Sequence, residues 1–460
     1  MNKAFYTLFL LICFSVSAQI IVDVKQSDIV DGQVNLTLNI EPVAVEPPIE
    51  PEPVEPPPIV VVPPIDGQVL FPEDLAEIMP DSTPLNPHVP LGLQAQFDIK
   101  YLGAFKLSSK NNESNSNYAT GILGYNQTKN SIFMAGHAQH NAIAEFEIPN
   151  TLTIETDVKN IQNAKVLQNY VRILDDTSNN KINGLLVYND KLLVTSEIWY
   201  DAGGQNKNNL QVLDVNNIIA PPKGMLQLEG AALIAGYMSE IPESATGMLG
   251  GEYIAGWSSV YSINNRYSHG PSMTIFNPHD AITSNLTVAS SIKQVYPMEK
   301  GKLLIEGSHL TSEDIVSPVW GTLSSAKYGF IIPKTSLFMV VGTHAGLHGG
   351  VGYKIIQEGE SKACAGSCAT KKGDSYNYFW LYDVNDIVNA ANPWDARPFS
   401  YGKWMMPFNK YNGDLAAIIG ATFDSDSNRL YINLSGAGQS SKYGHPSMVV
   451  TFEIKTNKSN

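Results

Sequence analysis

The sequence predicts an all-β fold, and two observations carry that prediction. Helical periodicity is scarce along the 460 residues, and the one segment that favours a short helix is 385–391. One pattern occurs four times: a glycine with an apolar run, a turn, a second apolar run, a loop, and a third run ending in an acidic and then a branched residue. Short strands repeated at intervals of tens of residues are typical of a β-propeller. The four copies begin at Gly121, Gly184, Gly329 and Gly420.

The second and third runs of the pattern enclose loops that are expected to lie together on one face of the propeller. The third runs end at Glu147-Ile148, Asp214-Val215, Asp383-Val384 and Glu453-Ile454. Two further segments, 269–276 and 445–452, each place a histidine just before a strand, so we expect both to enter third strands. Because equivalent loops of a propeller lie on one face, the loops between second and third runs predict where a site would be found. At roughly 40–50 residues per blade, residues 96–460 suit about seven blades.

Composition divides the chain into three parts. Residues 1–18 resemble a secretory signal peptide, with Lys3, a short apolar run and small residues before the expected cleavage point. Residues 19–95 are rich in proline and glutamate, which predicts a largely disordered linker. Residues 96–460 form the predicted propeller, which is the third part. We therefore expect a secreted protein, extracellular or periplasmic, without a membrane span because no apolar run is long enough.

Charge is concentrated in the linker. Residues 19–95 contain thirteen acidic residues and one basic residue, which leaves residues 96–460 close to neutral although the whole chain has a formal net charge of −14. An anionic polymer is therefore compatible with the folded part, where local arrangement decides binding. No basic run or basic–aromatic stripe occurs, so nucleic acid is not expected as a partner.

Two cysteines remain after the predicted signal peptide. Cys364 and Cys368 are four residues apart, and in an oxidising compartment a small-loop disulfide is the first interpretation. The alternative is a structural metal site in which His344 or His348 completes the ligand set. The neighbouring tract 344–352 is rich in glycine but lacks the ending of a phosphate-binding loop.

Several short phrases along the predicted propeller together resemble one family. The phrases lie at 102–105, 135–137, 144–149, 199–202, 235–238, 266–271 and 382–387. In their order they resemble the secreted β-propeller polysaccharide lyases that cleave ulvan, a sulfated rhamnose–uronic acid polymer of green algae. The resemblance implies a seven-bladed propeller, a basic canyon on one face, and β-elimination by histidine, tyrosine and arginine. It implies no cofactor for the chemistry, and a structural metal ion such as zinc or calcium in some members.

A lyase of this type must remove the proton next to a uronate carboxylate, and a cation must neutralise that carboxylate first. Arginine suits this role because its planar guanidinium pairs both oxygens and stays protonated. The predicted propeller has four arginines, at positions 172, 266, 397 and 429. Arg266 is the first choice because it lies in a polar loop before His269, and Arg172 is the second.

The acid and base are expected in the loops between second and third runs. His137 follows the end of a run in the first copy, and Tyr200 occupies the matching loop of the second. A histidine, or a tyrosine beside a positive charge, can exchange a proton near neutral pH, so we expect these two as the acid–base pair, with the roles left open. Trp199 could stack on a sugar ring. His140 and His269 are the remaining expected substrate contacts.

Two other functions are compatible with the same fold. A non-catalytic propeller that binds a glycan or a protein would use the same face without convergent histidine, tyrosine and arginine. A glycoside hydrolase would need paired carboxylates, and the predicted loops contain few acidic residues. We therefore expect a monomeric lyase acting on an anionic, uronic-acid-containing polysaccharide.

Overall fold

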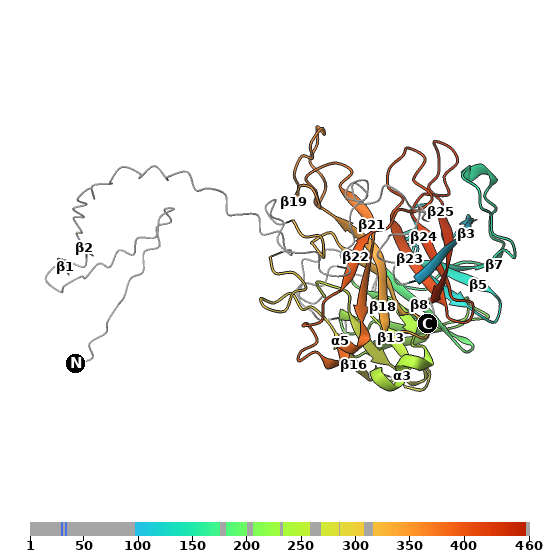
Figure 1. Ribbon diagram of the computed structural model, residues 1–460, viewed down its shortest axis with the longest axis horizontal. Helices are drawn as coiled ribbons and strands as arrows, with labels where there is room; N and C mark the ends of the chain where they lie inside the picture. Colours follow the sequence, from blue (N-terminus) through green and yellow to red (C-terminus); the bar gives the residue numbers. More distant parts are fainter. Residues whose placement is uncertain are drawn as a thin grey trace, which may run out of the picture. The chain divides into compact units, whose positions relative to one another are not determined.

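The computed structural model describes residues 29–30, 33–34, 97–174, 181–199, 206–230, 233–257, 268–284, 286–307 and 316–456 (Figure 1). The chain divides into two units, residues 1–62 and 63–460. In the first, β1 (Ile29–Val30) pairs with β2 (Gln33–Val34). The predicted signal peptide, and the predicted linker apart from these two strands, lie outside the described residues.

The described residues of the second unit form five propeller blades, which are antiparallel sheets apart from one parallel edge strand in blade 2. Blade 1 consists of β4 (Leu123–Asn126), β5 (Ser131–Ala135), β6 (Ala142–Glu147) and β7 (Val166–Arg172). Blade 2 consists of β8 (Lys181–Tyr188), β9 (Lys191–Glu197), β10 (Leu210–Asp214), β11 (Lys223–Leu228) and the parallel edge strand β15 (Thr287–Val288). Blade 3 consists of β12 (Met238–Glu240), β13 (Tyr253–Ala255), β14 (Met273–Phe276) and β16 (Ser290–Gln294).

Blades 4 and 5 complete the set. Blade 4 consists of β17 (Ser325–Ile331), β18 (Leu337–Ala345), β21 (Ser375–Asp383) and β22 (Ser400–Lys403). Blade 5 consists of β23 (Ile418–Asp424), β24 (Arg429–Leu434), β25 (Ser447–Thr456) and β3 (Phe97–Leu107). The strand β3, from the start of the described propeller, is thus the outermost strand of the last blade, beside β25 (Figure 1).

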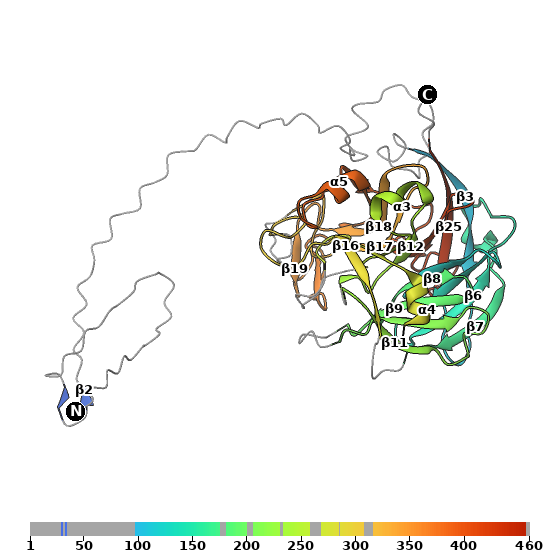
Figure 2. The same cartoon turned by 90° about the horizontal axis from the view of Figure 1, so that it is seen from below.

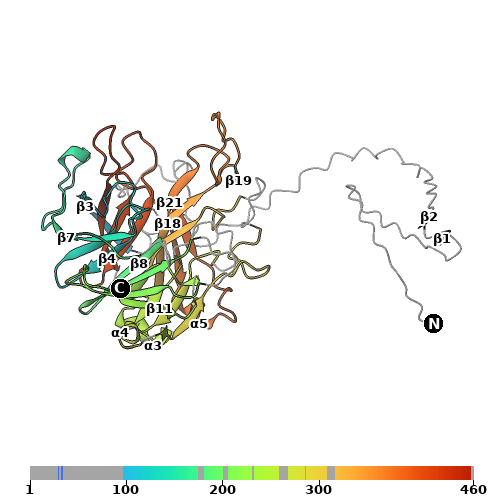
Figure 3. The same cartoon turned by 180° about the vertical axis from the view of Figure 1, so that it is seen from behind.

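The innermost strands form a closed ring. Neighbours in contact are β4 with β8, β8 with β12, β12 with β17, β17 with β23, and β23 with β4. Figure 3 shows β4 beside β8. The ring therefore closes with five blades among the described residues, and the expected count of seven is wrong. The blades are longer than expected because of insertions: the loop between β18 and β21 contains a separate hairpin of β19 (Val351–Tyr353) and β20 (Ser367–Ala369).

Helices are few and short in the part of the chain that the structure describes. The predicted helix at 385–391 is confirmed as α5 (Val384–Asn389), where the Asp383 side chain caps the N-terminus by accepting from the backbone N–H of Asn385. The others are η2 (Val158–Asn160), α3 (Glu243–Leu249) and α4 (Pro278–Thr283). Helices α3 and α5 lie side by side (Figure 2) and bury Leu249 and Ile387 in the largest apolar cluster.

The glycine that opens each copy of the pattern has a packing role. A Cβ at Gly184 would overlap the carbonyl oxygen of Gly236 in the next blade, and one at Gly420 would overlap the carbonyl oxygen of Gly121. A Cβ at Gly329 would press against the ring of Tyr237. Innermost strands converge on the axis, so these positions require a residue without a side chain. The repeated glycine therefore marks the contact between neighbouring blades.

The acidic–branched ending also has a structural cause. The backbone N–H groups of Ile148, Val215, Val384 and Ile454 donate to the carbonyls of residues 130, 190, 336 and 428, respectively. Each acceptor immediately precedes the second strand of the same blade. The branched residue is buried in every case and extends the pairing of third and second strands by one bond. Apolar side chains of adjacent blades then fill the space between the sheets, as in the cluster shared by blades 1 and 2.

Candidate functional site

Strand direction separates two ends of the propeller. The innermost strands begin at one end, where the loops between second and third strands also lie. His137, Trp199 and His445 are in those loops, so we call this end the histidine face. The innermost strands finish at the other end, at residues such as Tyr188, Glu240 and Asp424, and we call that end the cavity face. The predicted third-strand positions of the 269–276 and 445–452 segments are confirmed by β14 and β25.

A pair of stacked histidines forms the centre of the candidate site. The rings of His137 and His140 lie 4.3 Å apart between centroids, with planes 23° from parallel. Both belong to the tight turn between β5 and β6, in which the His140 N–H donates to the His137 carbonyl at 2.9 Å. The spacing of three residues in a turn places both rings on the same side. The structure thus joins two residues that the sequence analysis had assigned to different roles.

Ser114 contacts both histidines of this turn through its hydroxyl group. Its side chain is buried, and its Oγ accepts from the His137 N–H at 3.2 Å and lies 3.2 Å from Nδ1 of His140. The His137 N–H also donates to the Asn115 carbonyl at 2.9 Å. The segment containing Ser114 is anchored in turn on blade 1, because Ser116 Oγ lies 3.0 Å from the buried hydroxyl of Tyr170.

Tyr118 and His445 extend the site toward blade 5. The Tyr118 ring is 59 % exposed; it lies 4.5 Å from the His445 ring and 6.2 Å from the His137 ring, in an edge-on geometry to the latter. The backbone φ of Tyr118 is 49°, in the left-handed region. That conformation is uncommon for an aromatic residue and is often found at functional sites. Asn117 accepts the His445 N–H at 2.7 Å and fixes the two loops together.

Arg172 supplies a cation beside the histidine pair. It is the last residue of β7 and is exposed, and its Nε donates to the His140 carbonyl at 3.2 Å. This bond sets the guanidinium next to the turn that carries both rings. The cluster of Tyr118, His137, His140, Arg172 and His445 is called the histidine cluster below.

The protonation of His137 follows from its contacts. Partial burial, and then the neighbouring His140, lower the pKa of His137 below its ordinary value. Its Nδ1 accepts the N–H of Gln139 at 3.2 Å, so the neutral ring carries its proton on Nε2. At neutral pH, His137 is therefore an uncharged ring whose Nε2–H can donate a hydrogen bond to an oxygen of a bound ligand.

Other predicted site residues have different outcomes. Tyr200 and Arg266 lie outside the described residues, so their roles stay predictions. Trp199 is 53 % exposed at the end of the described part of its loop, on the histidine face. His269 is not a surface contact: its side chain is buried, its N–H donates to the Tyr296 carbonyl, and its ring packs edge-on against Trp320. The expectation that His269 contacts substrate is therefore corrected.

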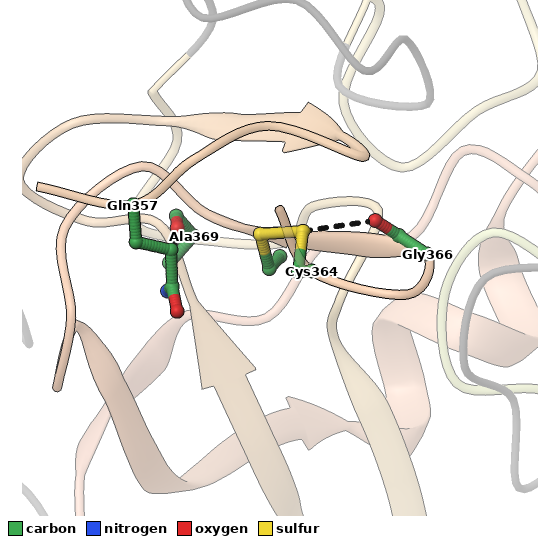
Figure 4. The surroundings of a disulfide bond; sticks show 5 residues. Gln357, Cys364, Gly366 and Ala369 are labelled. Carbon is green, nitrogen blue, oxygen red and sulfur yellow. Dashed lines mark hydrogen bonds between the residues drawn. A yellow bond between two sulfur atoms is a disulfide. The ribbon is translucent and has the colours of Figure 1, made fainter. Parts of the chain in front are cut away.

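The expected metal ligands do not form a metal site. Cys364 and Cys368 are joined in a disulfide in the β19–β20 hairpin, where Gln357 donates to the Ala369 carbonyl beside it (Figure 4). His344 is buried; its Nε2 donates to the Ser317 carbonyl at 2.8 Å and its Nδ1 accepts from Ser324 Oγ at 2.6 Å. In the described part of the chain, no group of three or more His, Cys, Asp or Glu side chains could hold a metal ion.

Two residues of interest, Tyr118 and Lys327, have no signal in the sequence that predicts their roles. Tyr118 follows a polar stretch with no strand pattern, and only its loop conformation brings it to the cluster. Lys327 sits at a bulge in the innermost strand β17, where burial lowers its pKa to about 7, with Lys181 adding to the shift and Glu197 opposing it. Its side chain keeps intermediate exposure. An amine that is partly uncharged at neutral pH can accept a proton, and a burial-induced shift has no local sequence signal.

Comparisons with known proteins identify no family for this chain. No protein-family model matches the chain, and no curated protein matches it. Among solved structures, the Pan2 WD40 domain of Neurospora crassa is similar over 78 % of this chain and 96 % of that one, with 7 % identity and a TM-score of 0.30. The N-terminal domain of Nup159 has the same coverages, 10 % identity and a TM-score of 0.29. Likeness at this level carries no functional argument.

One further finding concerns membranes. No helix among the described residues is long and apolar enough to cross a bilayer.

Proposed function

We propose that the histidine face binds a uronic-acid-containing sulfated polysaccharide such as ulvan and cleaves it by β-elimination. The observation that supports the proposal is the stacked pair of His137 and His140 with Arg172 bonded to the same turn. General acid–base catalysis and carboxylate neutralisation need these residue types within reach of one sugar. Exposed Tyr118 and Trp199 on the same face offer stacking surfaces for sugar rings.

The reaction divides naturally among these groups. A guanidinium pairs the uronate carboxylate, which makes the C5 proton easier to remove. A base takes that proton, the electrons form a C4–C5 double bond, and the C4–O bond breaks. The leaving oxygen takes a proton from an acid, and the Nε2–H of neutral His137 can donate a hydrogen bond to that oxygen. His140 and Tyr200 are the candidates for base and acid, with the roles left open. Arg172 is the candidate carboxylate partner alongside Arg266.

The decisive assay uses the unsaturated product. A lyase creates a 4,5-unsaturated uronate that absorbs ultraviolet light, a hydrolase creates only reducing ends, and a binding protein creates neither. The secreted form of the protein is incubated with ulvan, alginate, pectin and glycosaminoglycans, and absorbance is followed. Absence of a signal on every polymer would reject the lyase proposal.

Substitutions then test the histidine cluster. His137→Ala and His140→Ala are each expected to lower kcat about a hundredfold or more. The first removes a hydrogen-bond donor to the leaving oxygen, and the second removes a candidate acid–base group. His279→Ala on helix α4 is the matched control for the two histidine variants, because it removes an exposed histidine elsewhere. Arg172→Gln is expected to lower kcat/KM. Normal turnover in His137→Ala with an unchanged circular dichroism spectrum would remove His137 from the mechanism.

The pH profile gives an independent check on His137. Because its pKa is lowered, the ring is expected to stay neutral below the ordinary histidine value of about 6.5. Activity that depends on the neutral ring should therefore persist through that pH and fall only in more acidic solution. A fall centred above pH 7 would contradict this assignment.

A second function is favoured by the exposed aromatic side chains. Tyr118, Trp199 and Tyr443 lie in loops of the histidine face and are 59 %, 53 % and 82 % exposed. Aromatic rings bind the apolar faces of sugars without any chemistry. The alternative is therefore a glycan-binding propeller, which would retain ulvan on an affinity column and generate no unsaturated product.

A further inference from the structure

A cavity opens on the cavity face, at the opposite end of the innermost strands from the histidine cluster. Its volume is about 260 Å³. All five innermost strands line it, with Tyr125 from β4, Tyr188 from β8, Glu240 from β12, Tyr328 from β17 and Asp424 from β23. Because every blade contributes, the cavity is a consequence of the closed ring. Its size suits a small group and is below the usual range for drug-sized ligands.

The ionisable groups of this cavity are acidic. Glu240 and Asp424 line it, and no lysine, arginine or histidine does so among the described residues. Glu240 accepts a hydrogen bond from Ser425 Oγ at 3.2 Å and has no cationic side chain within ion-pair distance in the described part of the chain. Partial desolvation, with help from Asp426 and Glu252, raises the pKa of Glu240, although the residue as a whole remains exposed to solvent.

The walls of the cavity are aromatic. Tyr188 and Tyr253 meet edge-on with ring centroids 5.5 Å apart, and Tyr125 stacks on Tyr431 at 5.9 Å. Glu240 is close enough to Tyr253 to raise the pKa of that phenol, although burial is the larger cause. Tyrosine faces attract cations, and the attraction grows when the site is partly desolvated.

We propose that this cavity binds an organic ammonium ion, held by Glu240 and the rings of Tyr188 and Tyr253. An uncompensated carboxylate supplies the charge, and the aromatic walls accept the alkyl groups around the nitrogen. A metal ion fits poorly, because no three metal-ligating side chains converge in the described residues. A neutral sugar would gain no ionic attraction from Glu240. The inference is independent of the proposed lyase activity, which concerns the other face.

Calorimetry with matched probes tests the charge requirement. Choline is compared with dimethylbutanol, in which carbon replaces the quaternary nitrogen, at equal ionic strength. Nα-acetyl-lysine amide is the third probe, and it distinguishes a protein lysine side chain from a free quaternary amine as the source of the cation. At least one cation is expected to bind about tenfold more tightly than the neutral isostere.

Variants locate the binding. Glu240→Gln and Tyr253→Leu are each expected to weaken binding of the cation several-fold or more, whereas Tyr253→Phe keeps the ring and should retain most of the affinity. Glu243→Gln, an acidic residue at the start of α3 that does not line the cavity, is the control for net charge. Thermal unfolding of each variant reports whether it is folded.

Three results would overturn the proposal. These are equal affinity for choline and its neutral isostere, unchanged affinity in folded Glu240→Gln, or no binding of any cation at millimolar concentration. Because lyase activity is measured on ulvan with the histidine cluster, its presence or absence does not affect this outcome.

Discussion

Two histidines of this protein, His137 and His344, have different roles. His137 lies in an exposed turn against another histidine, whereas His344 is buried with both ring nitrogens hydrogen-bonded. Both occupy loops or strand ends that the repeated pattern makes equivalent in sequence. Burial lowers the pKa of His344 to about 4, so this ring is neutral and structural. Environment, and not residue type, thus separates the candidate catalytic histidine from the packing histidine.

The buried His344 predicts acid sensitivity. Its pKa is about 4 when folded and about 6.5 when unfolded, so the unfolded chain binds the extra proton between these values. Its contribution to stability is complete above pH 6.5 and is lost as pH falls toward 4, by roughly 3 kcal/mol in total. Urea unfolding of the wild type and His344→Gln at pH 7 and pH 4.5 measures this: the wild type should lose more stability. An equal loss in both proteins would contradict the assignment.

At the scale of elements, the repeated pattern describes blade geometry. The opening glycines lie where neighbouring innermost strands approach most closely, and the branched residue that ends each third run extends the ladder. These features depend on local spacing and were visible in four copies. Blade 3 lacked a clear copy: its first two strands, β12 and β13, have three residues each, too few for a readable alternation. Its third strand was recognised from the 269–276 segment.

The glycine contact predicts an asymmetry between two glycine variants. Gly184→Ala is expected to destabilise the fold by about 1–3 kcal/mol, because the new methyl overlaps the Gly236 carbonyl. Gly224→Ala in the outer strand β11 meets nothing within 4 Å and should be neutral or slightly stabilising. Urea unfolding of both variants compares them directly. Equal stability would show that the blades can shift apart at little cost.

For the whole molecule, closure of the ring is the main structural fact. Strand β3 completes blade 5 by pairing with β25 along its length, and it buries Phe97, Ile99, Phe105 and Leu107. Residues more than three hundred positions apart therefore share one sheet. Main-chain hydrogen bonds between β25 and β3 therefore tie the end of the propeller to its beginning.

Closure predicts the effect of removing β3. A chain that begins at residue 108 is expected to lose cooperative unfolding and to aggregate, because the edge of β25 and the apolar partners of Phe105 become exposed. A chain that begins at residue 90 retains β3 and is the control. Size-exclusion chromatography and thermal circular dichroism distinguish the two. A monomeric, cooperatively folded shorter chain would contradict the role of closure.

By itself, the sequence determined the all-β propeller class, the strand segments of four blades, helix α5, and the loops in which His137, His140 and Trp199 lie. Alternation, turns and spacing are local properties, so they can be read along the chain. Tertiary structure decided the number of blades and the tyrosine-lined cavity. It also decided the burial of His269 and His344 and the approach of Tyr118 and Arg172 to the histidine pair. The lowered pKa of Lys327 has the same origin. Each of these depends on contacts between segments far apart in the chain, which pack together only when the ring closes.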